Sequence, residues 1–177
     1  KEIHVVYVGG LKIKDTLDTE SFWNFFPKIT DQKIHFHVYS EQPKQVINKF
    51  KEIEKNNKYF HCEGFANHRK LIKKMAVYDF SIASADFKNA PIAWQKSVFG
   101  FKVFDSIMAK ILYINPNNLT ATTQFLEKNK VGVGYDYSKL HKIKYYLSKI
   151  KTRNYQDHFE NYINNYNEKK LIDFILN

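Results

Sequence analysis

Short apolar, β-branched segments alternate with helical patterns along this sequence, and this alternation constrains the fold more than any other feature. Strands that alternate with helices form parallel sheets, and right-handed connections wind the helices over both sheet faces. We therefore predict an α/β fold with a doubly wound, six-stranded parallel sheet of the Rossmann-like type. The six predicted strands are Ile3–Val8, Ile34–Tyr39, Tyr59–Cys62, Phe80–Ala83, Ile111–Ile114 and Val131–Gly134.

Apolar residues three or four positions apart predict the helices between these strands. One begins at Asp18 or Thr19, and residues 84–100 are expected to be the least regular stretch. We predict one domain over residues 1–177, with a Rossmann-like core at about 1–136 and a helical tail at about 137–177. The other predicted helices are Pro43–Lys55, a segment around Leu71–Ala76, Lys102–Ala109 and Leu119–Lys128.

The charge of the chain indicates an anionic partner. A formal charge of +10 and a pI near 9.4 fit a nucleotide diphosphate, a nucleic acid or an acidic membrane surface. Charge alone does not choose among these, and a general abundance of Lys explains the excess equally well. The single Cys62 excludes an intramolecular disulfide, and its apolar surroundings predict a core residue and not a nucleophile.

No segment reaches the 18 or more apolar residues of a membrane span, and no signal peptide is visible. We predict a cytoplasmic location, because one cysteine fits a reducing compartment. Lys1 leads directly into a strand, as expected of a domain taken from a longer chain.

Glycines mark two loops at which an anion can bind. Gly9 and Gly10 follow the first strand, with Lys12 and Lys14 close behind, and such a turn lets a phosphate approach the backbone. The same glycine pair is also typical of a plain tight turn.

The second glycine, Gly100, directly precedes a predicted helix that carries Asp105 one turn later. A phosphate at the helix N-terminus and a ribose diol on the carboxylate together make a nucleotide site. Taken alone, Asp105 is explained equally well as a solvated residue whose negative charge interacts favourably with the helix dipole.

The order of these motifs, from the first glycine loop through H-C-E-G-F and K-K-M-A-V-Y-D-F to S-V-F-G-F-K-V-F-D, resembles a known family. This is the C-terminal, donor-binding domain of GT-B glycosyltransferases of the family 4 type (glycosyl transferases group 1). Its motif is E-x-F-G-(x)4-E, followed by G-x-P-V-I. Ser97 stands at the first Glu, Phe99 and Gly100 match, and Asp105 stands at the second Glu. Further on, Lys110 replaces the Gly and Leu112 the Pro, and the resemblance spans residues 3–135.

The resemblance implies a role for each matching position. Asp105 is expected to hold the donor ribose, the Gly9-Gly10 loop with Lys12 or Lys14 to face the phosphates, and Gly64 with Phe65 to lie beside the nucleobase. Two departures matter, because Ser97 has no carboxylate for the donor sugar and Gly10 stands where the family has an Arg. Ser97 and Asp105 are the catalytic candidates. The residues expected at the pyrophosphate and sugar are Gly100, Phe101, Lys102 and Val103.

The function implied is transfer of a sugar from a UDP- or GDP-type donor to a glycan, lipid or protein acceptor, in bacterial polysaccharide biosynthesis. No cofactor is expected, and an N-terminal domain outside these residues would supply the acceptor contacts. Two alternatives remain open. One is a GT-B-like binding module without catalysis, and the other is a nucleotide-sugar epimerase of the same fold.

Other motifs are weaker. His35 and His37 share one strand face, but no third ligand is predicted nearby, and the remaining histidines are scattered, so no metal is expected. The chain lacks the G-x-S-x-G and P-loop motifs. The basic residues of the tail, interleaved with Tyr, predict a solvated helix face or a contact with an anionic membrane at its inner side; nucleic acid is not expected. These basic residues are Lys139, Lys142, Lys144, Lys149, Lys151 and Arg153.

Overall fold

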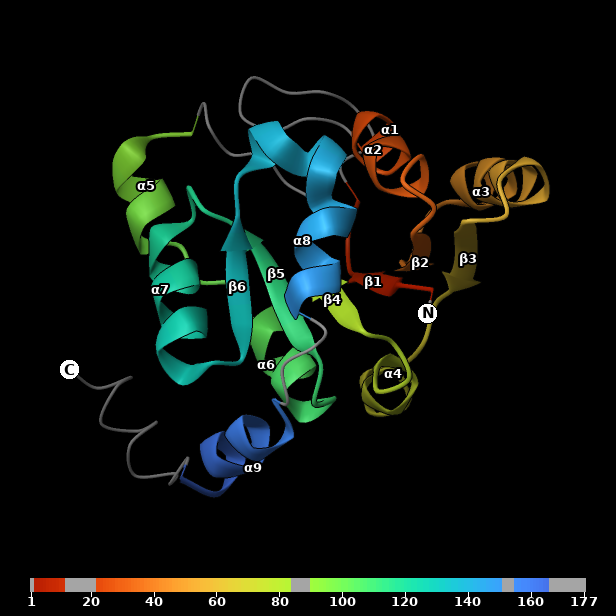
Figure 1. Ribbon diagram of the computed structural model, residues 1–177. Coiled ribbons are helices and arrows are strands. Elements are labelled where there is room, and N and C mark those ends of the chain that lie inside the picture. Colours follow the sequence, from red (N-terminus) through yellow and green to blue (C-terminus); the bar gives the residue numbers. More distant parts are fainter. Residues whose placement is uncertain (1, 12–21, 84–89, 151–154, 166–177) are drawn as a thin grey trace.

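A computed structural model describes residues 2–11, 22–83, 90–150 and 155–165, and these contain one six-stranded sheet in which every pairing is parallel (Figure 1). The strand order is β3-β2-β1-β4-β5-β6. The predicted doubly wound, six-stranded parallel sheet is therefore confirmed. The strands are β1 His4–Val8, β2 His35–Tyr39, β3 Phe60–Gly64, β4 Phe80–Ile82, β5 Leu112–Pro116 and β6 Gly132–Tyr135.

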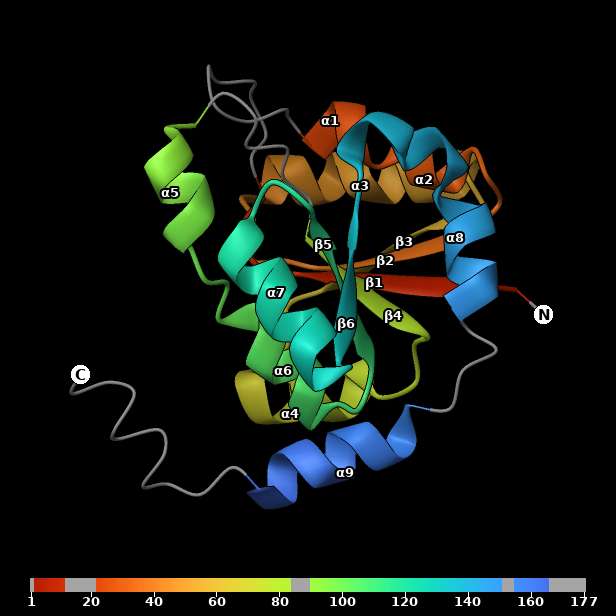
Figure 2. The same ribbon diagram turned by 60° about the vertical axis from the view of Figure 1, so that its left-hand side comes forward.

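Helices cover both faces of the sheet. α1 to α3 and α8 lie on one side, and α4, α6 and α9 lie on the other (Figures 1 and 2). The described residues after β6 are mostly helical, as predicted for the tail. The helices are α1 Phe22–Phe25, α2 Pro27–Thr30, α3 Lys44–Asn56, α4 His68–Met75, α5 Ile92–Ser97, α6 Lys102–Met108, α7 Thr120–Asn129, the 3-10 helix η1 Tyr137–Lys142, α8 Ile143–Ile150 and α9 Gln156–Asn165.

The two faces of the sheet have different cores. Beneath α1 to α3 lies a cluster of buried aromatic rings that includes Phe22, Phe36, Phe50 and Phe60. On the opposite face, Leu71 and Met75 of α4 pack with Val6 and Tyr39. Aromatic rings bury large areas, so the first cluster gives β1 to β3 much of their anchorage.

Two sequence predictions are corrected. The stretch expected to be irregular contains α5, which begins after Pro91, a residue suited to a helix start, and exposes Trp94. The fifth strand was expected to end at Ile114 but continues to Pro116, because Asn115 and Pro116 still pair with β6. The neighbouring strand β6 decides the end of β5, which local sequence does not show.

Within the described residues, none of the helices combines the length and the apolar content that a bilayer crossing requires.

Candidate functional site

The strand order reverses between β1 and β4, and in open α/β sheets ligands bind outside the carboxyl ends of the strands at such a point. Gly9 directly follows β1 there, with a backbone φ of +114° that side chains rarely adopt. The Gly9 amide donates to the Tyr39 carbonyl over 2.9 Å, and the Ser40 hydroxyl donates to the Gly9 carbonyl over 2.7 Å. The glycine turn is thus held firmly at the carboxyl end of β1.

Lys102, the first residue of α6, covers this turn. A Cβ placed on Gly9 would come within 2.5 Å of the Lys102 Nζ. The same Nζ lies 3.4 Å from the Tyr7 hydroxyl and 4.7 Å from the centre of the Tyr7 ring. The start of α6 therefore brings an ammonium group to the first glycine loop.

Asp105 stands one turn further along α6, with about one fifth of its side chain exposed. Its Oδ1 lies 2.7 Å from Nε2 of His68, the first residue of α4. Tyr113 of β5 is buried close by. Burial raises the pKa of its hydroxyl, and the nearby Tyr7 and Asp105 raise it further. A carboxylate and an imidazole therefore meet beside α6, the helix whose first residue brings the ammonium group to the Gly9 turn.

The start of α6 has one buried and one open side. Val103 is fully buried, whereas Phe101 is 84% exposed. The Gly100 amide lies 3.4 Å from the Thr122 hydroxyl oxygen, and that hydroxyl donates to the Val98 carbonyl. The loop that leads into α6 is thus tied to α7, which fixes where the helix begins.

The remaining predicted residues are less closely gathered. Gly64 ends β3 with a φ of +73°, and Phe65 beside it is 68% exposed. Gly10 accepts a hydrogen bond from the Tyr7 hydroxyl at its carbonyl. Ser97 is exposed, and its hydroxyl donates to the Ala93 carbonyl in its own helix over 2.9 Å. Lys12 and Lys14 lie outside the described residues.

Sequence reasoning missed three residues of this edge: Tyr7, His68 and Tyr113. His68 carried the clearest signal, because it follows the third strand and so belongs to a carboxyl-end loop. Tyr7 and Tyr113 lie inside strands, where an aromatic residue predicts core packing. Only the strand order brings Tyr113 close to both Tyr7 and Asp105.

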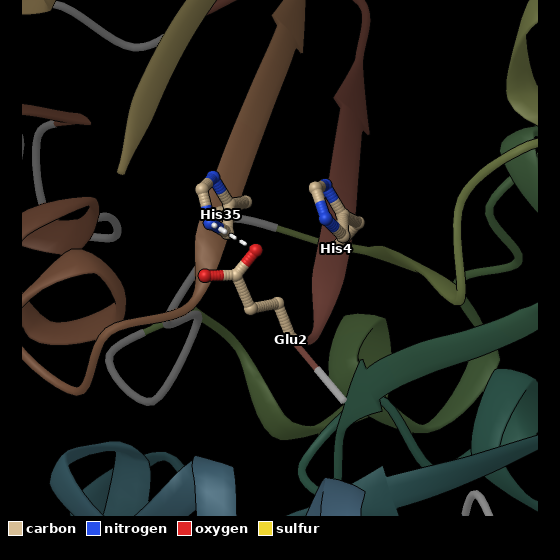
Figure 3. Close-up of side chains that lie close together, drawn as sticks. All are labelled: Glu2, His4 and His35. Atoms are coloured by element: carbon tan, nitrogen blue, oxygen red, sulfur yellow. Dashed lines mark ion pairs between the residues drawn. The ribbon is translucent and has the colours of Figure 1, made fainter. Parts of the chain in front are cut away.

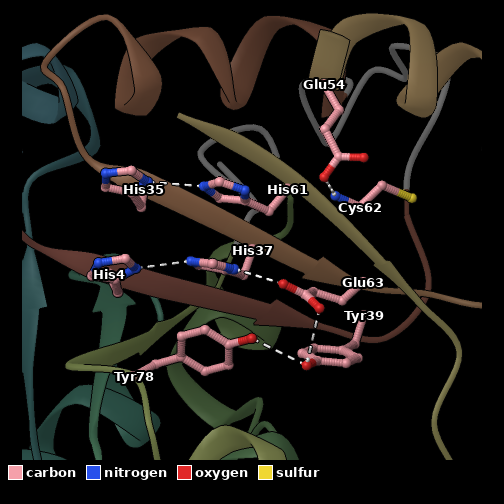
Figure 4. A network of polar contacts seen from close by, with 9 residues as sticks. All are labelled: His4, His35, His37, Tyr39, Glu54, His61, Cys62, Glu63 and Tyr78. Atoms are coloured by element: carbon pink, nitrogen blue, oxygen red, sulfur yellow. Dashed lines mark hydrogen bonds and ion pairs between the residues drawn. The ribbon is translucent and has the colours of Figure 1, made fainter. Parts of the chain in front are cut away.

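A second polar cluster, the histidine cluster, lies on the α4 face and contains His4, His35, His37 and His61 (Figure 4). His4 Nδ1 lies 3.0 Å from His37 Nε2, and His35 Nδ1 lies 2.9 Å from His61 Nε2. His37 Nδ1 in turn lies 2.8 Å from Glu63 Oε1. Burial, reinforced by His37 and His35, lowers the pKa of His61 to about 4.

The expectation that His35 and His37 have no further ligand-type side chain nearby is wrong. The register pairs His4 with His35 across β1 and β2, and His37 with His61 across β2 and β3. Alternation along each strand then points all four rings to the same face. The sequence of a single strand does not show which strands lie next to it or in what register they pair.

A groove of about 350 Å³ lies between α8 and the outer strands β5 and β6. Its lining is mostly apolar, with Ile114, Tyr135 and Leu147 among the residues. None of the residues predicted to bind a donor contributes to it.

Comparison with solved structures finds the same architecture. The structure titled "Crystal Structure of TarM" superposes with a TM-score of 0.62 at 14% identity, covering 97% of this chain and 34% of that one. The structure titled "Crystal structure of GtfA/B complex" superposes with a TM-score of 0.54 at 9% identity, covering 92% of this chain and 32% of that one. This chain thus spans about a third of each neighbour. A scan against protein-family models gives no match, and a search of curated proteins finds no significant relative.

Proposed function

From a GT-B glycosyltransferase-like fold, we propose that this chain binds a nucleotide diphosphate sugar of the UDP or GDP type. It forms the C-terminal, donor-binding half of a family 4-like glycosyltransferase, and an N-terminal domain supplies the contacts to the acceptor, which is a glycan, lipid or protein. The observation that carries the proposal is the position of Lys102 over the Gly9 turn at the β1/β4 switch point, with Asp105 one turn later on the same helix.

The charges at this edge match the chemistry of such a donor. The Lys102 ammonium group and the backbone from Gly100 to Val103 face the pyrophosphate, and the Asp105 carboxylate accepts two hydrogen bonds from the ribose diol. In the free chain, His68 Nε2 is hydrogen-bonded to Asp105 Oδ1. Donor binding therefore replaces this hydrogen bond by those from the ribose hydroxyls.

The proposed chemistry relies on orientation and charge. As the bond between sugar and diphosphate breaks, negative charge grows on the leaving diphosphate, and fixed donors and Lys102 stabilise it. Closure of the acceptor-binding half would exclude water from the cleft.

Calorimetric titration with UDP-glucose, UDP-N-acetylglucosamine and GDP-mannose tests the proposal. At least one of these is expected to bind, and Asp105→Ala is expected to weaken that binding tenfold or more, since hydrogen bonds to a charged group are worth about 1.5–3 kcal/mol. The matched control is Asp31→Ala, an exposed carboxylate at the end of α2. Equal affinity in the Asp105→Ala and Asp31→Ala chains would remove Asp105 from the site.

A binding module that has lost catalysis is the second candidate, favoured by Ser97 and Gly10. The Ser97 hydroxyl is turned back onto its own helix, and Gly10 supplies no cation. Each missing charged contact weakens transition-state stabilisation by about 3 kcal/mol. This candidate predicts donor binding without sugar release when the longer protein receives donor and acceptor. A GT-B-fold epimerase would instead interconvert donor sugars without an acceptor.

A further inference from the structure

The amino ends of β1 and β2 carry three side chains that converge near the surface: Glu2, His4 and His35 (Figure 3). One ligand-type atom from each lies within 4.8 Å of the other two. Glu2 is largely exposed, whereas the side chain of His35 is only 14% exposed. A small ion can therefore reach the position from solvent on the Glu2 side.

The hydrogen bonds of the histidine cluster leave a bare lone pair on His4. The Glu63 carboxylate only accepts hydrogen bonds, so the neutral His37 ring carries its proton on Nδ1, and its Nε2 accepts from His4 Nδ1. His4 then has its lone pair on Nε2. A carboxylate that orients a ligand histidine through a hydrogen bond is a common feature of metal sites.

His35 also has one engaged and one unengaged ring nitrogen. Its Nδ1 is engaged by His61, and its Nε2 is buried without a hydrogen-bond partner among the described residues. The nearest acidic atom, Glu2 Oε2, lies 3.4 Å away, which is long for a hydrogen bond. Buried polar atoms are seldom left unpaired, so this nitrogen calls for a partner.

A zinc-type ion satisfies these atoms. Tetrahedral Zn²⁺ with bonds of about 2.0–2.1 Å holds its ligand atoms roughly 3.4 Å apart, which matches the separation of Glu2 and His35. The rings of His4 and His35 lie stacked with their centres 4.5 Å apart, so binding would tilt their edges toward each other. The His4 backbone stays anchored meanwhile, because its amide donates to Asp79 over 2.9 Å.

We propose that Glu2, His4 and His35 bind a divalent transition-metal ion of the zinc type, with water completing the coordination. Two imidazoles and one carboxylate are a common ligand set for this ion. The site joins the amino ends of β1 and β2, at the opposite end of these strands from the Gly9 turn. The ion therefore has a structural role, separate from the proposed donor site.

The test uses the untagged 177-residue chain, freed of metal by a chelator and titrated with Zn²⁺ in competition with a chromophoric chelator. We expect about one ion per chain and a tenfold to hundredfold loss of affinity in Glu2→Gln and His35→Ala. The matched control, His141→Ala, removes an exposed histidine on η1 and is expected to leave affinity unchanged. Because Glu2 is exposed, Glu2→Gln stays decisive if the His35 variant misfolds.

Co²⁺ adds a spectroscopic readout, since a tetrahedral site of this kind gives intense visible bands that hydrated Co²⁺ lacks. Absence of Zn²⁺ uptake, or uptake that Glu2→Gln leaves unchanged, overturns the proposal. Titration of UDP-glucose with and without Zn²⁺ keeps the two proposals apart, because metal removal is expected to leave donor affinity unchanged.

Discussion

Gly132 shows how close packing constrains a single residue of the sheet. A Cβ at this position would lie 2.3 Å from the backbone oxygen of Tyr113 and 2.8 Å from a methyl group of Leu126. We expect Gly132→Ala to lower the free energy of unfolding by about 2–3 kcal/mol, because the backbone of β5 cannot give way cheaply. Urea denaturation measures the loss. In the control Gly10→Ala, where nothing lies within 4 Å, the change is expected to stay within about 0.5 kcal/mol.

Glu63 links the histidine cluster to pH. The hydrogen bond from His37 holds the pKa of this carboxyl below its usual value of 4.5 in the folded chain. Its contribution to stability is therefore complete above the unfolded-state pKa and is lost as the pH falls through the folded-state pKa. We expect Glu63→Gln to cost about 1 kcal/mol at pH 7 and progressively less below about pH 4.5. Urea titrations at several pH values give the result, and a pH-independent difference would contradict it.

Individual site residues were predicted only where a sequence motif pointed to them. Gly9, Gly100 and Asp105 were predicted from a glycine before a helix and from the order of neighbouring motifs. The histidine cluster was missed because its formation depends on which strands are neighbours, and His68 was missed although its place after the third strand pointed to it. Alternation predicts that His35 and His37 share a face, but only the pairing of β2 with β1 and β3 adds His4 and His61 to it.

Among the elements, α7 ends in a residue that is poorly suited to its backbone. Lys130 has a φ of +55°, the left-handed region in which glycine is favoured at helix ends. We expect Lys130→Gly to raise the free energy of unfolding by roughly 0.5–1 kcal/mol. Lys128→Gly, two residues earlier inside the helix, is expected to lower it by about 1 kcal/mol. Thermal or urea unfolding of both variants checks the opposite signs.

The elements were predicted better than their ends. All six strands came from apolar runs bounded by turn residues, because a parallel sheet buries its strands on both faces. α5 was missed, since Pro91 and the short apolar spacing of Ile92 to Ser97 indicate a loop when read alone. At Lys110 the sequence shows the change of residue type but not the backbone conformation that results. It stands where the family that the sequence resembles has a glycine, and it adopts a φ of +57°.

For the whole molecule, the two proposed sites lie at opposite ends of the same strands. Hydrogen exchange is expected to separate them. A bound nucleotide sugar should slow exchange at Gly9 and from Gly100 to Lys102, whereas Zn²⁺ should slow it around His4 and His35. Protection of both regions by either ligand would show that the sites are coupled and would contradict independent roles.

The fold was predictable as a whole because it follows from rules that apply to every strand and connection, whereas the proposed function rests on a few particular side chains. The chain spans about a third of each neighbour of similar fold. Under the proposal, the acceptor contacts lie outside these residues. Within the chain, Lys102 and Asp105 could be predicted at the carboxyl edge from the glycine that precedes their helix. The hydroxyls of Tyr7 and Tyr113 beneath them could not, because strand order decides their position.

The exposed position of Trp94 on α5 gives the protein a built-in fluorescent reporter. The chain has only two tryptophans, and the other, Trp23, packs against Phe22, Phe26 and Phe50 in the aromatic core. In a Trp23→Phe chain, all indole emission would come from Trp94, which is 40% exposed and six residues before Gly100. The emission wavelength and the quenching of Trp94 would then report on the segment that leads into α6, without any added dye.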